Sequence, residues 1–149
     1  MDLPKIRNAT LDDVPALVPL LNDLGYPTTE SALKKHFTHF ISQHGYGIAV
    51  AVLKGNVVGF VAWSLSFFFV SNTTRFRIEG LLVDDRYRGL GVGKKLMQHV
   101  EDIAQSKSPA VVELTSGKRR AIDGAHTFYK NLGYKNEGLT EKVYLRKTF

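Results

Sequence analysis

The chain has 149 residues, of which 44% are hydrophobic, 23% charged and 11% aromatic. This balance is typical of a globular domain and excludes a disordered or a membrane-embedded chain. No apolar run reaches the roughly 20 residues that a membrane-spanning helix needs. Without a linker composition anywhere, we expect one domain over residues 1–149.

The charge and the cysteine count narrow the chemistry further. The net charge of +6 favours anionic partners, which include nucleic acid, an acidic membrane surface or a phosphorylated small molecule. The absence of cysteine removes disulfides, thiolate zinc sites and a cysteine nucleophile. The N-terminus shows no basic-then-apolar signal pattern, so we expect a cytoplasmic protein.

The first third of the chain predicts one strand and two helices. Residues 5–8 resemble a short strand, and the apolar spacing over 14–24 is helical. Pro19 should kink or interrupt that helix, because proline lacks a backbone N–H and clashes with the preceding turn. Thr28 or Thr29 is expected to cap the second helix.

The middle of the chain predicts β-structure. Residues 48–53 and 57–69 are rich in β-branched and aromatic side chains, and the turn signal of residues 54–56 joins them into a hairpin. Residues 74–83 form a third long predicted strand. A glycine-rich turn then leads into an amphipathic helix that ends before residue 108.

The last third predicts a mixture of short elements. Residues 110–115 read as a buried strand, and a fourth helix covers 125–132. Two short strands are expected near 134–136 and 142–146. The predicted order is β-α-α-β-β-β-α-β-α-β-β, which places the chain in the α/β class, or α+β by some schemes.

The turn from Arg88 to Gly93 is the most informative segment. Gly89, Gly91 and Gly93 let the backbone pass close to a ligand. The helix that begins there adds unpaired N–H groups and about half a positive charge, which together suit a pyrophosphate. Lys94 and the lysine after it add cations. The alternative is a tight turn that needs glycine for its geometry alone.

Two other phosphate motifs do not match this turn. A dinucleotide-binding fingerprint has the spacing Gly-x-Gly-x-x-Gly, whereas this turn has Gly-x-Gly-x-Gly. A Walker loop requires Gly-Lys-Ser/Thr, and Gly93-Lys94-Lys95 lacks the hydroxyl that holds magnesium. We therefore expect a phosphate site without a metal ion.

Two motifs resemble the GNAT acetyltransferase superfamily. Arg88, Gly91 and Gly93 occupy the fixed positions of its Arg/Gln-x-x-Gly-x-Gly/Ala signature, and residues 125–134 resemble its second signature. The order of predicted elements is also similar over nearly the whole chain. The resemblance implies a mixed, mostly antiparallel sheet of six to seven strands flanked by four helices.

The resemblance also implies acetyl-coenzyme A as co-substrate. Its pyrophosphate would lie on the amides of residues 88–94, namely Arg88, Gly89, Leu90, Gly91, Val92, Gly93 and Lys94. Its pantetheine arm would pair with Leu81, Leu82 and Val83, in the gap where that strand parts from Thr115 and Ser116.

Within the superfamily the chain is similar to small-amine enzymes, including aminoalkylphosphonate N-acetyltransferases. Glu113-Leu114-Thr115-Ser116, followed by a basic stretch, carries this narrower similarity. It implies a small-molecule amine as acceptor. Protein lysine or N-terminal acetylation, and a non-catalytic acyl-coenzyme A-binding domain, remain the alternatives. A nucleic-acid partner is not expected, because the basic residues cluster at the turn and in one loop.

Tyr129 and Glu79 are the candidate catalytic residues. Tyr129 matches the family's general acid, since a phenol with a pKa of about 10 can protonate a departing thiolate. Its alternative is a core tyrosine. Glu79 interrupts an apolar strand, where a carboxylate is unusual. It would act as a base or water relay, as a substrate anchor, or merely as a salt-bridge partner of Arg75 or Arg77.

Three further features are less specific. The backbone N–H near Leu82 or Val83 is the candidate oxyanion donor. The basic loop Lys118–Arg120 would meet a coenzyme phosphate or an anionic substrate, or lie free in solvent. His36 and His39 lack partners at metal-ligand spacing, so no metal site is expected.

The aromatic residues of the long hairpin suggest a packing surface. Trp63 and the run Phe67-Phe68-Phe69 are expected in the core or in the interface of a homodimer. We expect no membrane partner.

Overall fold

The computed structural model describes residues 2–116, 124–138 and 141–149, which form two compact units. The first unit covers Met1–Val112 and the second Glu113–Phe149. The sheet runs in the order of the sequence: β1 (Lys5–Asn8), β2 (Gly47–Leu53), β3 (Asn56–Phe67), β4 (Thr74–Val83) and β5 (Ala110–Glu113). The helices of the first unit are α1 (Val14–Leu24), α2 (Glu30–Ile41) and α3 (Val92–Gln105), with short 3₁₀ turns η1 (Leu11–Asp13) and η2 (Asp85–Tyr87).

Strands β1 to β4 are antiparallel, and the β2–β3 hairpin has the tight turn that the sequence predicts. Lys54 and Gly55 both adopt positive φ, at 50° and 79°. Two central residues in the left-handed region define the type I′ turn, whose twist matches that of the two strands. The predicted hairpin is therefore confirmed.

Strand β5 runs parallel to β4 and covers only part of it. The amide of Thr74, the first residue of β4, donates to the carbonyl of Pro109, which immediately precedes β5 (2.9 Å). Because the two strands begin at the same level, they point the same way, with α3 as the crossover between them. Strand β4 has ten residues and β5 has four, so the last part of β4 extends beyond its neighbour.

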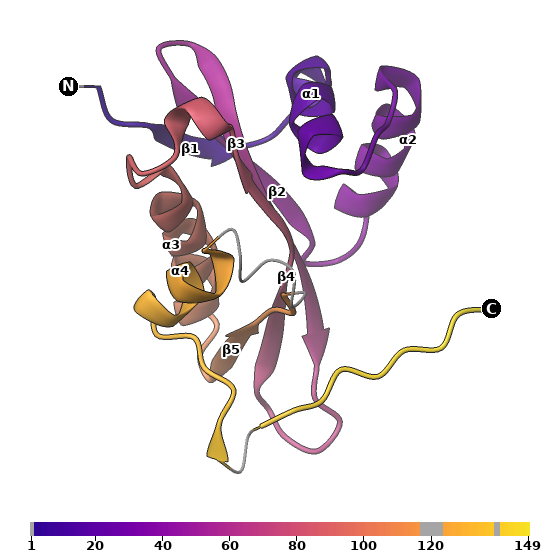
Figure 1. The fold of residues 1–149 in the computed structure, drawn as a ribbon. Coiled ribbons are helices and arrows are strands. Elements are labelled where there is room, and N and C mark those ends of the chain that lie inside the picture. Colours follow the sequence, from indigo (N-terminus) through magenta and orange to yellow (C-terminus); the bar gives the residue numbers. More distant parts are fainter. Residues whose placement is uncertain (1, 117–123, 139–140) are drawn as a thin grey trace. The chain divides into compact units, whose positions relative to one another are not determined.

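The two faces of the sheet are buried under different helices (Figure 1). On one face, α1 contributes Leu17 and Leu20 to a cluster with Val50, Phe60 and Leu82. On the other face, Trp63 packs against His99 of α3, with ring centroids 5.7 Å apart. Trp63 is thus a core residue, one of the two outcomes expected from the sequence.

A β-bulge at Glu79 changes which residues of β4 face each helix layer. Ala62 pairs with Gly80 and Trp63 pairs with Ile78, so Glu79 has no partner on β3. Ile78 lies opposite Trp63 and therefore on the α3 face, whereas Leu82 lies in the α1 cluster. In a regular strand, residues four apart share a face, so the extra residue reverses the alternation.

One buried carboxylate joins β1 to the start of α1. Both oxygens of Asp13 accept hydrogen bonds from Arg7, each at 2.8 Å, and one also accepts from the amide of Thr10. The Asp13 side chain is 7% exposed. The hydrogen bonds from Arg7 hold the pKa of Asp13 below its ordinary value, although burial acts in the opposite direction.

We expect Asp13→Asn to lower the free energy of unfolding by about 1–2 kcal/mol at pH 7, since it removes charge-assisted bonds to a half-exposed arginine. A carboxyl whose pKa is depressed by folding stabilises the protein above its unfolded pKa of about 3.9, and that contribution is lost as the pH falls through the folded pKa. Urea unfolding at several pH values measures this. The exposed Asp12→Asn variant is the control, and an equal loss in both variants would contradict the assignment.

The second unit contains α4 (Ala125–Asn131), which ends at a left-handed glycine as predicted. Gly133 has a φ of 95°, and the amide of Tyr134 donates to the carbonyl of Tyr129 (3.0 Å), which closes the helix end. The two predicted C-terminal strands are wrong for the part of the unit that is described. Residues 134–136 and 142–146 pair with no strand there, and Val143 and Leu145 are exposed. Strand propensity alone does not form a strand without a partner.

Of the two outcomes predicted for Pro19, an interruption of the helix is wrong, and a kink stays a prediction. Helix α1 continues through Pro19 without interruption from Val14 to Leu24. Proline costs one backbone hydrogen bond there, and the buried side chains Leu17 and Leu20 on either side of it hold the helix against the sheet. The four predicted helices and the mixed, mostly antiparallel sheet are confirmed, with five strands among the described residues rather than six or seven.

Candidate active site

The turn between η2 and α3 takes its shape from two glycines. Gly89 and Gly91 have φ values of 77° and 82°, in the left-handed region that other residues avoid. A Cβ atom at either position would meet no heavy atom within 4 Å. The glycines are therefore needed for their backbone angles, and the space beside them is open.

Helix α3 begins at this turn with free backbone donors. Gly91 is its N-cap, and the amide of Lys95 is bonded to the Gly91 carbonyl (3.1 Å). The amides of Val92, Gly93 and Lys94 precede that bond and have no acceptor within the helix. No side chain among the described residues caps them, and the first turn contains no acidic residue. A 14-residue helix that begins in this way can hold an anion.

The side chain of Arg88 makes two contacts within the loop. Its Nε donates to the carbonyl of Val83 (3.3 Å), and its Nη1 pairs with Asp85 (2.8 Å). These contacts tie the turn back to the end of β4, so the guanidinium braces the loop. A role of Arg88 in binding a phosphate stays a prediction.

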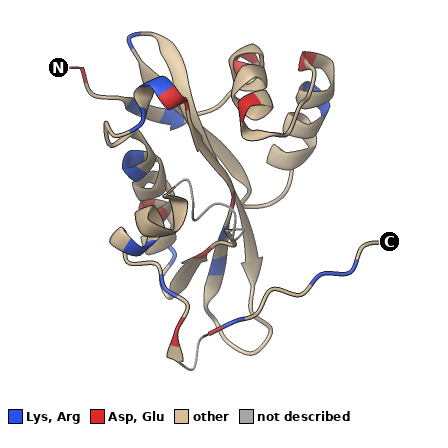
Figure 2. Cartoon of the chain, viewed as in Figure 1, with Lys and Arg blue, Asp and Glu red and all other residues tan. Residues whose placement is uncertain are grey.

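Acidic and basic residues both occur next to this turn (Figure 2). Asp84 caps η2 by accepting from the Arg86 amide (3.0 Å), and it also pairs with the Arg86 guanidinium (2.8 Å). The Arg86 hydrogen bonds lower the pKa of Asp84. Arg86 and Arg88 are each neutralised by an aspartate, Asp84 and Asp85 respectively. The net positive charge beside the turn therefore comes from Lys94 and Lys95.

The last residues of β4 present main-chain groups to an edge that β5 does not cover. The Asp84 amide donates to the carbonyl of Val58 on β3 (2.8 Å). In an antiparallel pair alternate residues point toward the neighbour, so the Leu82 amide also faces β3, and Leu81 and Val83 face the other side. That side is where β5 stops short. Of the two predicted oxyanion donors, the Val83 amide is therefore the one on the open edge.

Glu79 lies on the face of the sheet that carries α1 and α2. Its Oε1 accepts from the Ser64 hydroxyl (2.7 Å) and lies 3.7 Å from Nε of Arg77. The Glu79 side chain is 38% exposed. The salt bridge, one of the three roles predicted from the sequence, is thus present, and both of these contacts are made by Oε1.

The remaining predicted residues belong to the second unit. Tyr129 lies on α4, where its ring packs against Phe128 and Tyr134 at centroid distances of 5.1 and 6.1 Å. Thr115 and Ser116 follow β5 without regular structure. Their position beside Glu79 and the open edge of β4 stays a prediction. The basic loop Lys118–Arg120 lies outside the described residues.

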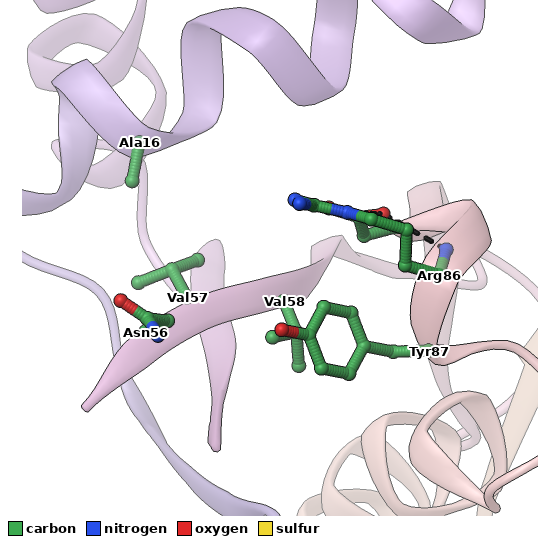
Figure 3. Close-up of a pocket in the computed structure, with 7 residues that line it drawn as sticks. Ala16, Asn56, Val57, Val58, Arg86 and Tyr87 are labelled. Carbon is green, nitrogen blue, oxygen red and sulfur yellow. Dashed lines mark hydrogen bonds and ion pairs between the residues drawn. The ribbon is translucent and has the colours of Figure 1, made fainter. Parts of the chain in front are cut away.

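A cavity of about 320 Å³ lies in the first unit on the α1 face (Figure 3). It is lined by Ala16, Asn56, Val57, Val58, Asp84, Arg86 and Tyr87. The Arg86 side chain reaches across it toward α1 while remaining paired with Asp84. It includes neither Glu79 nor the turn glycines, so it is distinct from the predicted site.

Sequence reasoning missed the bulge and the Ser64 contact. The sequence does contain a signal for the bulge. Phe76 and Ile78 alternate with polar residues, but this alternation breaks at Glu79 and Gly80, and an unbroken apolar run of 81–83 follows.

Among the described residues, no cluster of three or more potential metal ligands occurs. No described helix is both long enough and apolar enough to cross a bilayer.

The fold and the turn identify the class of protein. The chain belongs to the GNAT family of acetyltransferases, whose family model matches residues 14–134. It is therefore an acyltransferase.

Two relatives and one solved structure illustrate the similarity. An uncharacterised N-acetyltransferase of Archaeoglobus fulgidus is 31% identical over 122 residues, which cover 76% of this chain and 82% of the relative. An aminoalkylphosphonate N-acetyltransferase of Salmonella typhimurium is 26% identical, covering 91% of this chain and 87% of the relative. A GNAT family acetyltransferase structure from Staphylococcus aureus superposes with a TM-score of 0.78 at 22% identity, covering 99% of this chain and all of that one.

Proposed function

We propose that the protein transfers an acetyl group from acetyl-coenzyme A directly to the primary amine of a small molecule. The observation that carries this proposal is the uncapped start of α3, next to the open edge of β4. The two features provide donors for a diphosphate and an unpaired strand edge for an extended amide-containing arm. Coenzyme A contains both groups in that order.

The residues present fit this co-substrate. The amides of Val92, Gly93 and Lys94 would hold the diphosphate, with Lys94 adding its charge. The main-chain groups of Leu81 and Val83 would pair with the pantetheine amides, in the manner of an added strand. Acetyl-coenzyme A supplies the activated acetyl group. Because the chain has no cysteine, a cysteine-bound acetyl intermediate is excluded and direct attack by the amine is favoured.

Glu79 would bind the acceptor's ammonium group. Its Oε1 accepts a hydrogen bond from Ser64, which fixes the carboxylate on the sheet face while Oε2 can contact the acceptor. The partly exposed position also gives water access, so the proton that the ammonium must lose can leave through a water molecule. We therefore favour the anchor and water-relay roles over direct deprotonation.

Val83 and Tyr129 would complete the transfer. The Val83 amide would donate to the oxygen that becomes negative when the amine attacks, a contact typically worth about 3 kcal/mol. Tyr129 would give its phenolic proton to the departing thiolate. Tyr129 and Thr115–Ser116 would have to approach the β4 edge for this role.

The small-molecule acceptor is supported by the similarity to the Salmonella relative, whose name specifies an aminoalkylphosphonate. A screen of acetyl-coenzyme A consumption against aminoalkylphosphonates, amino acids, polyamines, aminoglycosides and peptides tests the proposal. We expect turnover with at least one small amine. Acetylation of peptides alone would replace the proposal with protein acetylation, and the absence of any coenzyme A binding by calorimetry would overturn it.

We further propose that the protein is a homodimer that buries the tip of the β3–β4 hairpin. Phe67, Phe69 and Val70 are 68%, 103% and 87% exposed there, an unusual concentration of apolar surface. We expect a dimer by analytical ultracentrifugation and a shift toward monomer in the variant Phe69→Ser. The equally exposed Phe149→Ser is the control. A monomer before any substitution would contradict the proposal.

The cytoplasmic location stays a prediction.

A further inference from the structure

A row of polar side chains continues from Glu79 along the face of the sheet that carries α1 and α2. On β3, Phe60 belongs to the α1 cluster, so the residues at two-residue steps from it share that face, as far as Ser64 and Ser66. Their partners on β4 are Arg77 and Arg75. We call the set of Ser64, Ser66, Arg75, Arg77 and Glu79 the polar strip.

The bulge is the reason that Glu79 ends this strip. Arg75 and Arg77 precede the bulge and point opposite to the buried Phe76 and Ile78. The contact between Glu79 and Ser64 places the carboxylate on the same side as these arginines. Two residues span about 7 Å along a strand, so Arg77 begins one step from Glu79 and Arg75 one step further.

The charges of the strip are ordered, with one anion at the end and two cations behind it. Nε of Arg77 lies 3.7 Å from Oε1 of Glu79, which is longer than a hydrogen bond, and the Arg77 side chain is 36% exposed. The guanidinium of Arg75 lies 4.0 Å above the ring of Phe68, a contact that orients it. An acceptor whose ammonium contacts Glu79 would therefore have the rest of its structure beside Arg77.

This arrangement discriminates among amines. A diamine bound to Glu79 would bring its second positive charge toward two arginines, and like charges at such distances repel. A neutral amino alcohol would gain no charge-assisted bond. An amine that also carries a carboxylate, phosphonate or phosphate would place opposite charges on both ends of the strip, and a guanidinium binds such groups in a bidentate manner.

We propose that the acceptor is an amine with an anionic group a few atoms from the nitrogen, and that Arg77 is the residue that selects it. Arg75 would bind the anionic group of longer acceptors. This inference rests on the proposed function, since it places the acceptor's ammonium at Glu79. It adds the chemical class of the acceptor and the residue that recognises it.

The test compares amines of similar size and different charge. β-Alanine and 2-aminoethylphosphonate carry an anion, β-alaninamide is neutral beyond its amine, and 1,3-diaminopropane carries a second cation. We expect kcat/KM for the two anionic amines to exceed that for β-alaninamide by about 10- to 100-fold, as one charge-assisted bond allows. The diamine should be the poorest substrate.

Two variants assign the preference to Arg77. Arg77→Gln should raise KM for the anionic amines about tenfold or more and change kcat little, which reduces their advantage over β-alaninamide. Arg77→Glu should move the preference toward 1,3-diaminopropane. Lys107→Gln is the control, because it removes one positive charge from an exposed position just beyond α3 and should leave the ranking unchanged.

The outcomes separate this inference from the function on which it rests. Equal kcat/KM for charged and neutral amines would overturn the inference and leave the acetyltransfer to small amines intact. A preference for anionic amines that survives in both Arg77 variants would overturn the role of Arg77. Failure of every small amine, with coenzyme A still bound, would overturn the proposed acceptor and this inference together.

Discussion

Replacing Tyr129 by phenylalanine is expected to lower kcat by about 10²- to 10⁴-fold, the usual contribution of a positioned general acid. The variant removes only the hydroxyl, so the ring contacts with Phe128 and Tyr134 remain. Affinity for coenzyme A should change little, because the phenol acts on the departing thiolate rather than on the diphosphate. Single-turnover kinetics and calorimetry measure the two quantities separately.

Tyr134→Phe is the matched control for this experiment. Tyr134 packs against Tyr129 in the same unit and directly follows Gly133, the glycine that ends α4. Its variant also removes one phenolic hydroxyl. We expect kcat to stay within a few-fold of the unmodified protein. If Tyr129→Phe instead abolishes coenzyme A binding, or if both variants lose activity equally, then Tyr129 is not the acid.

The second large effect is expected for Gly91→Ala. Gly91 has a φ of 82°, where a side chain costs about 1–2 kcal/mol, and its carbonyl accepts the first hydrogen bond of α3. Relief of that strain by rotation would turn the first amides of the helix away from the diphosphate. We expect coenzyme A affinity to fall about tenfold or more, measured by calorimetry.

Gly55→Ala separates loss of affinity from loss of stability. Gly55 has a φ of 79° in the β2–β3 turn, and a Cβ atom there would also meet nothing within 4 Å. Both variants should therefore lose a similar free energy of unfolding, and only Gly91→Ala should lose coenzyme A affinity. Unchanged binding in Gly91→Ala would remove the turn from the proposed site.

Local patterns predicted the parts of the fold that local forces determine. The Lys54–Gly55 turn and the glycine cap of α4 depend on backbone angles that few residue types adopt, so the residues at these positions predict them. The two C-terminal strands failed because a strand requires a partner, and propensity does not say whether one is present. The predicted interruption at Pro19 is wrong for a related reason: burial of α1 against the sheet outweighs one missing hydrogen bond.

The candidate site shows the same division. A carboxylate in an apolar strand drew attention to Glu79, and one of the three roles predicted for it, a salt bridge with Arg75 or Arg77, is present with Arg77. The contact with Ser64 depends on the register of β3 against β4, which the sequence of one strand does not contain. The role of Tyr129 depends on how distant segments meet, which no local pattern specifies.

The extra residue at Glu79 divides β4 into two halves, in which residues of opposite sequence parity face the α1 layer. Before the bulge, the odd-numbered residues 75 and 77 lie on the α1 face and should tolerate polar substitutions. After it, the even-numbered Leu82 lies on that face and should not, so the pattern of tolerated positions in a mutational scan would switch from odd to even at residue 79. Deleting Glu79 would not shorten a loop. It would remove the bulge and leave Ile78 opposite Trp63 and Leu82 opposite Phe60, so both halves of β4 would keep their layers and only the carboxylate of Glu79 would be lost.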